Sequence, residues 1–196
     1  MDKRIEGAEF SMIHPSLDAY ELWVRTHERL HPASCIWDDT TIKGEDTSEA
    51  HFASIIEAQE RARALNRTFL YWIIHRDTQE WIGTAAIYDV TQGEYPMGWL
   101  GVHIFEPYQR NTHGTQAAKA LIEHAFEDLE LWRIEMFSNT EDDGTHSLAQ
   151  KLGMSDEGTR RSRVRYNNSW HDAHIFCINR SEFTSHEETT SQAQAE

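Results

Sequence analysis

The sequence predicts an α/β protein in which about four helices are layered against a central mixed, mostly antiparallel sheet of about seven strands. Two observations predict this class. In the middle of the chain the spacing of apolar residues changes from about 3.6 to about 2, as it does where helices give way to strands. One strand of that region is followed by a loop, an amphipathic helix and a further strand, which is the order of a crossover connection.

The composition predicts one globular domain followed by a short tail. Hydrophobic residues make up 39% of the 196 residues and seven residues are tryptophan, which is enough apolar material for a core. A chain of this length suits a single core. Large apolar residues are missing from the terminal segment TSHEETTSQAQAE. We therefore expect residues 1–183 to form one domain and residues 184–196 to be a disordered polar tail.

The N-terminal part of the chain has the pattern of one strand and two helices. The second helix has the clearer start, because Asp46 and Glu49 have the spacing of a capping box. The elements predicted here are a strand at 8–13 and helices at 16–30 and 47–66.

Three strands follow, separated by the polar turn segments RDTQ and TQGEYP, and the first two form an antiparallel pair. The apolar run FLYWII in the first of them is typical of a buried core strand. The predicted strands are 67–76, 80–90 and 96–105.

The next helix has the most regular amphipathic pattern in the chain. Its apolar face consists of Ala117, Ala118, Leu121, Ile122, Ala125, Phe126 and Leu129. The remaining predicted elements are a strand at 132–139, a helix at 145–154, and two strands at 157–166 and 170–180 that form a hairpin across two asparagines.

Charge and composition exclude several classes of partner. The formal net charge of −15 argues against nucleic acid, because binding its phosphates requires a concentrated basic face. The apolar runs are far shorter than the roughly 20 residues that span a bilayer, and the N-terminus has no secretory-signal pattern. Only Cys35 and Cys177 are present, which favours a reducing compartment. We expect a cytoplasmic protein without a membrane partner, with its oligomeric state open and a homodimer among the alternatives.

The loop between Glu106 and Gly114 joins a strand directly to a helix. Such a helix start presents unpaired N–H groups at the positive end of the helix dipole, so it favours an anion. Arg110 and His113 add donors, and Gly114 stands where a backbone can approach a ligand closely. The spacing matches neither a nucleotide P-loop nor a dinucleotide fingerprint.

The stretch FEPYQRNTHGTQAAKALIEHAF resembles the acyl-CoA pyrophosphate motif of the GNAT superfamily of N-acetyltransferases, written Gln/Arg-x-x-Gly-x-Gly/Ala. Gln109 fills its first position and Gly114 its last, whereas Thr112 replaces the first glycine. The segments WRIEMFSN and GTHSLAQKLGMSDEGTRR are similar to the Rim-type branch, the ribosomal-protein N-terminal acetyltransferases. Gly144 stands where that branch usually has an asparagine.

This resemblance implies acetyl-CoA as the acyl donor and a primary amine as the acceptor. It implies that the pantetheine arm of the cofactor adds like a strand along the edge of the strand before the loop. Backbone N–H groups at that edge would hold the arm. Ser147 matches the serine thought to protonate the departing thiolate, although Thr145 or Ser147 could also be a helix cap. The residues implied to hold the cofactor are His103, Ile104, Phe105, Gln109, Arg110, Asn111, Thr112, His113, Gly114, Thr115 and Gly144.

The general base remains open. His103 has a suitable ordinary pKa of about 6.5 and is a catalytic candidate, with Glu135 or a water chain as competitors. No metal site is expected: His171 and His174, three apart on a strand, point to opposite faces. The loop acids around Asp143 are better explained as solvated residues at a helix start.

Two functions follow from the sequence. The first is an acetyl-CoA-dependent N-acetyltransferase acting on a protein N-terminal amine or on a small amine, with an acceptor pocket drawn from the first two helices and the segment around Trp37. The alternative is a catalytically impaired acyl-CoA-binding or regulatory module, suggested by Thr112 and Gly144.

Overall fold

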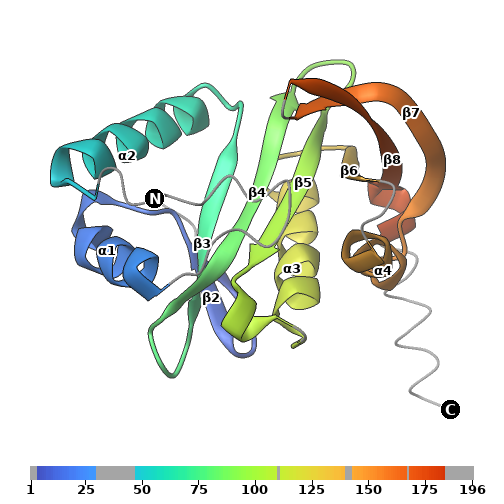
Figure 1. Cartoon of the computed structure of the whole chain (residues 1–196). Coiled ribbons are helices and arrows are strands. Elements are labelled where there is room, and N and C mark those ends of the chain that lie inside the picture. The colour runs from blue at the N-terminus through green and yellow to red at the C-terminus, as the bar shows by residue number, and fades with distance from the viewer. Residues whose placement is uncertain (1–3, 30–46, 110, 140–142, 167, 184–196) are drawn as a thin grey trace, which may run out of the picture. The chain divides into compact units, whose positions relative to one another are not determined.

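The computed structural model describes residues 4–29, 47–109, 111–139, 143–166 and 168–183 (Figure 1). The chain divides into two compact units, and each is described by itself. The first unit contains Met1–Asp89 and Gly101–Leu121, and the second contains Val90–Leu100 and Ile122–Glu196. Trp37, Cys35 and the tail from residue 184 lie outside the described residues.

The described strands form one mixed sheet of eight strands in the order β1-β2-β3-β4-β5-β6-β8-β7, which confirms the predicted fold class. The additional strand is β1, a two-residue strand that sequence periodicity did not indicate. The β5–β6 pair is parallel, so α3 is the crossover helix, as predicted. The strands are β1 Ile5–Glu6, β2 Phe10–Ile13, β3 Phe69–His75, β4 Trp81–Thr91, β5 Met97–Ile104, β6 Arg133–Asn139, β7 Ser155–Tyr166 and β8 Ser169–Asn179. The helices are η1 Leu17–Ala19, α1 Tyr20–Arg29, α2 Glu49–Ala64, η2 Glu106–Tyr108, α3 His113–Glu127 and α4 Asp143–Lys151.

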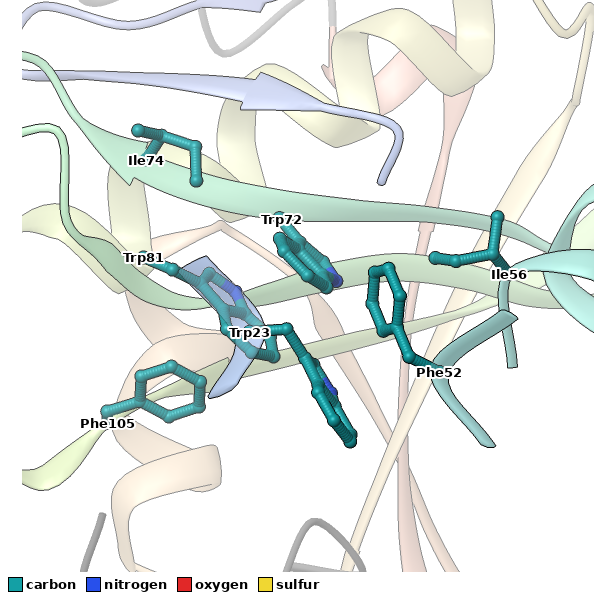
Figure 2. Close-up of a cluster of buried hydrophobic side chains, with 7 residues drawn as sticks. All are labelled: Trp23, Phe52, Ile56, Trp72, Ile74, Trp81 and Phe105. Atoms are coloured by element: carbon teal, nitrogen blue, oxygen red, sulfur yellow. The ribbon is translucent and has the colours of Figure 1, made fainter. Parts of the chain in front are cut away.

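The first unit is built on antiparallel pairs, β1 with β2, β2 with β3 and β3 with β4. Large aromatic side chains fill the space between the sheet and helices α1 and α2 (Figure 2). Trp72 and Trp81 stack with ring centroids 3.9 Å apart, and Trp23 and Phe52 pack beside them from the two helices. Trp72 and Ile74 of the run FLYWII lie in this core, and five of the six side chains of the run are buried, as predicted.

The start of α2 differs in detail from the expected capping box. The N-cap residue is Ser48, whose hydroxyl accepts a hydrogen bond from the backbone N–H of His51 at 3.2 Å. A serine hydroxyl satisfies one of the helix's unpaired N–H groups as well as a carboxylate does. The helix therefore begins two residues later than the sequence predicted.

The second unit is built around β6, which pairs antiparallel with β8, and the long β7–β8 hairpin (Figure 1). Trp99, Ala173 and Ile175 form a small buried cluster on one face of these strands. The apolar face predicted for the crossover helix is buried from Ala117 to Phe126, and only Leu129, beyond its end, is partly exposed. Among the described residues, no helix is long and apolar enough to cross a membrane.

Candidate active site

The chain leaves β5 through a short, strongly hydrogen-bonded loop in the first unit. The backbone N–H of Phe105 donates to the carbonyl of Ile82 on β4 at 2.9 Å. Just after η2, the side-chain amide of Gln109 donates to the carbonyl of Ile104 at 2.9 Å. The first residue of the predicted pyrophosphate motif thus closes the loop back onto the end of β5.

These bonds also show which backbone groups of β5 face β4. Besides the Phe105 N–H, the His103 carbonyl faces that strand, since a Cβ added at Gly83 would lie 2.2 Å from it. Successive residues of a strand direct their backbone groups to opposite edges. Of the three residues expected to hold the pantetheine arm, Ile104 is therefore the one whose backbone groups face away from β4.

The start of α3 has the features that an anion site needs. The first intrahelical bond runs from the Gln116 N–H to the Thr112 carbonyl at 2.9 Å, so the N–H groups of the three residues between them have no partner within the helix. The first turn contains no acidic residue. Thr112, the residue that departs from the motif, occupies the N-cap position, where threonine is favoured.

Packing within the protein does not require a glycine at position 114. A Cβ built on it would meet Ile104 Cγ1 at 3.4 Å, an ordinary van der Waals distance. A glycine with room for a side chain, next to unpaired N–H groups, fits a position that a bound group approaches closely. Arg110 lies outside the described residues, and Asn111 is exposed.

The side chain of His113 has a different environment from the one expected. It is only 5% exposed, its Nε2 lies 3.4 Å from the Glu9 carboxylate, and its ring packs edge-on against His75 with centroids 5.7 Å apart. Neither ring nitrogen makes a hydrogen bond to a described residue, so packing holds the imidazole between the start of α3, the β1–β2 turn and the end of β3. Its proposed contribution to a bound anion is through the backbone N–H.

His103 lies on the face of β5 that carries the aromatic core. Its half-buried ring is 5.5 Å from the ring of Phe105, which packs edge-on against Trp81. A second histidine, which sequence analysis did not single out, is His27 on α1, 5.7 Å from the Trp81 ring. Burial lowers the pKa of His27, so this imidazole is neutral at pH 7.

A three-residue polar network holds the first part of the loop, at Tyr108. The Tyr108 hydroxyl donates to one Glu80 oxygen at 2.5 Å, and Arg29 donates to the other at 2.5 Å. The hydrogen bond from Tyr108 and then the contact with Arg29 lower the pKa of Glu80 to about 2. Because the three residues are far apart in sequence, no local pattern could have predicted the network.

The second unit contains the remaining candidates. Ser147 is half-buried in the second turn of α4, and Gly144 is exposed in the first turn. Since α4 begins at Asp143, neither Thr145 nor Ser147 is the N-cap, and the capping explanation of these residues is wrong.

The residue before Ser147 belongs to a polar group beneath α4. The His146 ring lies 4.8 Å from that of His174, whose Nε2 contacts the Asp156 carboxylate at 2.7 Å. His146 Nε2 and the hydroxyl of Ser138 are buried and make no hydrogen bond to the described residues. Ser147 itself makes no hydrogen bond to another group in the described part of the chain.

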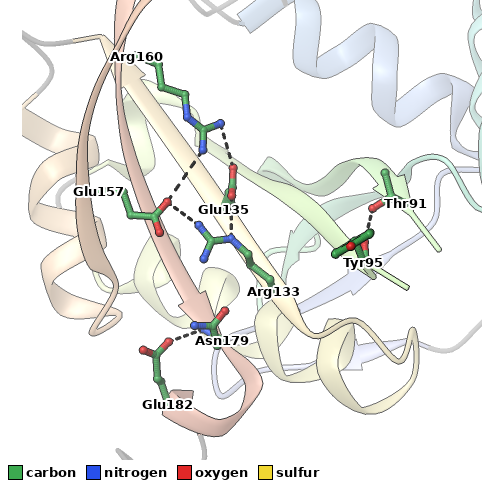
Figure 3. Close-up of polar contacts among 8 residues, drawn as sticks. All are labelled: Thr91, Tyr95, Arg133, Glu135, Glu157, Arg160, Asn179 and Glu182. Atoms are coloured by element: carbon green, nitrogen blue, oxygen red, sulfur yellow. Dashed lines mark hydrogen bonds and ion pairs between the residues drawn. The ribbon is translucent and has the colours of Figure 1, made fainter. Parts of the chain in front are cut away.

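Glu135, a competitor for the role of base, is buried within an ion-pair network (Figure 3). One of its oxygens accepts from Arg133 at 2.7 Å and the other from Arg160 at 3.5 Å. Glu157 contacts the same two arginines. Both Glu135 oxygens are occupied, which favours a structural role.

A mixed sheet with a β5–α3–β6 crossover and a helix start after β5 is the arrangement that the loop motif led us to expect for an acetyltransferase fold. The chain belongs to the GNAT family: the model of the GNAT acetyltransferase domain matches residues 16–155. It is an acetyltransferase by family.

Relatives and solved structures agree with this assignment. The probable N-acetyltransferase YjcK of Bacillus subtilis is 25% identical over 132 residues, covering 67% of this chain and 72% of YjcK. Mycobacterium smegmatis RimJ in complex with CoA-disulfide superposes with a TM-score of 0.73 at 18% identity, covering 88% of this chain and 83% of RimJ. RimL, a ribosomal L7/L12 α-N-protein acetyltransferase in complex with coenzyme A, has a TM-score of 0.72 at 12% identity, covering 90% of this chain and 98% of RimL. At these identities the superpositions show the fold.

Proposed function

We propose that this protein transfers the acetyl group of acetyl-CoA to a primary amine, either the N-terminal amine of a protein or a small amine. The observation that carries the proposal is the start of α3, where N–H groups without a partner in the helix, an acid-free first turn and an uncrowded Gly114 come after the loop that follows β5. Those are the properties that a pyrophosphate would need.

Each part of the site has a proposed task. The N–H groups of His113, Gly114 and Thr115 hold the pyrophosphate, with Gln109 keeping the loop in place. The Ile104 N–H, on the edge that faces away from β4, holds the pantetheine arm by a strand-type hydrogen bond, since the Ile104 carbonyl already accepts from Gln109. When bound, acetyl-CoA supplies a thioester whose C–S bond breaks as the amide C–N bond forms.

Two proton transfers accompany that exchange, one from the amine and one to the thiolate. Ser147 is the proposed acid that protonates the thiolate. His103 remains a candidate base, and the neutral His27 near the same aromatic core is a further one.

A protein N-terminus is supported as the acceptor by the Rim-type structures, which include a ribosomal-protein-S5-alanine acetyltransferase and a ribosomal L7/L12 α-N-protein acetyltransferase. A small amine stays the alternative acceptor, because the same fold also occurs in the microcin C7 self-immunity acetyltransferase MccE, solved with acetyl-CoA and AMP, at a TM-score of 0.70.

Gly114→Ala tests the cofactor site. Alanine has the higher helix propensity and fits the protein itself, so we expect the unfolding free energy to be unchanged or slightly higher. The added methyl would stand between the helix start and a close ligand, so CoA affinity measured by calorimetry should fall about 10-fold or more. Full affinity in the variant would remove this loop as the pyrophosphate site.

Turnover is tested by titrating free CoA thiol after incubation with acetyl-CoA and a panel of terminal peptides and small amines. Ser147→Ala should lower kcat by about 100-fold with little change in CoA affinity, whereas Ser155→Ala, an exposed serine of the same unit, should match the wild type. Equal turnover in both variants would exclude Ser147 as the acid. CoA binding without thiol release on any acceptor would favour the alternative, an impaired acyl-CoA-binding module.

A further inference from the structure

One part of this acidic protein is strongly basic. The stretch from Gly158 to His171 contains four arginines and no acidic residue, in a chain whose net charge is −15. The rest of the chain therefore has a formal net charge of −19. We call Arg160, Arg161, Arg163 and Arg165 the arginine strip.

The strip lies on the last strand of the sheet. β7 pairs only with β8 in the strand order, so its other edge has no partner strand among the described residues. The β7–β8 register shifts between Arg160 and Val164, where Ser162 has a positive φ of 49° and its N–H donates to the Asp172 carboxylate at 2.8 Å. This bulge interrupts regular backbone pairing along the edge, so a partner here must be recognised through side chains.

The indole of Trp99 orients two of the four guanidinium groups. Those of Arg160 and Arg163 lie over its ring, 5.9 Å and 5.1 Å from the centroid. Arg160 is also paired with Glu135 and Glu157 (Figure 3). No ion pair joins the other three arginines to an acidic group in the part of the chain that the structure describes.

We propose that the arginine strip is a docking surface for an extended, acidic polypeptide segment. Guanidinium groups bind carboxylates in a bidentate geometry, and an indole that holds them in place reduces the entropy lost on binding. The strip extends roughly 15 Å along β7, too long for one small anion and suited to several carboxylates spaced along a chain. The negative charge elsewhere repels such a segment from the rest of the surface and so confines it to β7.

Nucleic acid fits the surface less well. Its phosphates are closely spaced over a long path, so a strand would pass beyond four guanidinium groups onto acidic surface. The inference rests on the proposed function in one respect. We take the docked segment and the acceptor amine to belong to the same polypeptide, with the segment just after the amine in sequence. The acceptor is then a polypeptide with acidic residues near its N-terminus.

Binding is measured without turnover, by fluorescence anisotropy of a fluorescein-labelled dodecapeptide in which Glu alternates with Gly. Counterparts with Gln or Lys in place of Glu, and a single-stranded oligouridylate, are the comparison probes. We expect binding of the Glu peptide alone, weakening as salt rises. Tighter binding of the oligouridylate than of the Glu peptide would overturn the proposal.

R161S/R165S is the decisive variant, because both side chains are exposed and neither contacts Trp99. We expect the Kd for the Glu peptide to rise roughly 5-fold or more at low salt, and R161K/R165K to recover part of that loss. R67S/K151S removes the same charge from exposed sites outside β7 and should change the Kd by less than about 2-fold. Equal effects of R161S/R165S and R67S/K151S would show a general charge effect and refute the docking surface.

Arginines and a bulge on an edge strand could instead serve only to prevent edge-to-edge association. In that case R161S/R165S would increase self-association in sedimentation velocity and leave peptide affinity unchanged, which would overturn the inference. Peptide binding with no acetyl transfer to any amine would reject the proposed function and keep the docking surface. Acetyl transfer at equal kcat/KM to Glu and Gln peptides would reject the docking surface and keep the proposed function.

Discussion

The network of Tyr108, Glu80 and Arg29 predicts a pH-dependent contribution to stability from a single carboxylate. Glu80→Gln removes the charge and keeps the shape of the side chain. The pKa of Glu80 falls from an ordinary 4.5 to about 2. At about 1.4 kcal/mol for each pKa unit, the full shift corresponds to about 3 kcal/mol. The Glu80 and Arg29 side chains are 28% and 63% exposed, so solvent screening reduces this, and we expect a loss of about 1–2 kcal/mol at pH 7.

The sign follows from the lowered pKa. A carboxyl whose pKa is lowered in the folded state contributes its full stability above pH 4.5 and loses it as the pH falls through about 2. The difference in unfolding free energy between wild type and Glu80→Gln should therefore be largest at pH 7 and shrink steadily below pH 4.5. Urea denaturation followed by tryptophan fluorescence at pH 7, 5, 4 and 3 measures it.

Glu57→Gln is the matched control. Glu57 also pairs with an arginine, Arg61, at 2.6 Å, but both side chains are about 70% exposed, so we expect a change below about 0.5 kcal/mol at every pH. Tyr108→Phe should destabilise the protein in the same pH window as Glu80→Gln, because the Tyr108 hydrogen bond is the largest cause of the lowered pKa. If wild type and Glu80→Gln differ by the same amount at pH 7 and pH 3, the linkage reasoning fails.

Three further predictions concern the core and the buried thiol. Gly83→Ala places a Cβ 2.2 Å from the His103 carbonyl, so β4 and β5 must shift, and denaturant titration should show a loss of about 1–3 kcal/mol; wild-type stability would contradict the close approach. Leu121→Ala empties a fully buried position of α3 and should cost about 3–5 kcal/mol in the same titration, a loss that a side chain at the surface would not show. Burial raises the pKa of Cys177 to about 11, so this thiol should react with Ellman's reagent at pH 8 only after unfolding, and prompt labelling of Cys177 in the native protein, located by peptide mapping, would contradict its burial.

The elements that sequence predicted well are those with a strong local period. The crossover helix was predicted because Ala118, Leu121, Ile122 and Ala125 recur at helical spacing, and the structure buries all four. The same holds for β3, whose apolar run lies in the core. By contrast, β1 was not predicted because two residues are too few to show any period.

Details of the candidate site depend on residues that are distant in sequence. The loop was recognisable from Gln109 and Gly114, but nothing local indicated that the His113 ring turns toward Glu9 and His75. Nor did the sequence show that the Phe105 N–H already bonds to β4, because strand pairing is set by the register between two segments.

The roles of Ser147, His103 and Gly144 stay predictions from the family resemblance. What the structure adds for Ser147 is its place in the second turn of α4, next to the residue whose ring packs against His174. For Glu135 it adds two arginine partners that the sequence did not connect with it.

The sequence by itself determined the α/β class, the order of the main elements, the anion-favouring loop and the GNAT family, because periodicity, caps and short motifs are local properties of the chain. Only the tertiary structure decided that Tyr108 is linked through Glu80 to Arg29, that Gly114 is uncrowded, and that Arg160 and Arg163 of the edge strand β7 lie over the Trp99 ring. Those facts depend on contacts between segments far apart in the chain, which packing and strand register fix and which no single stretch of sequence contains.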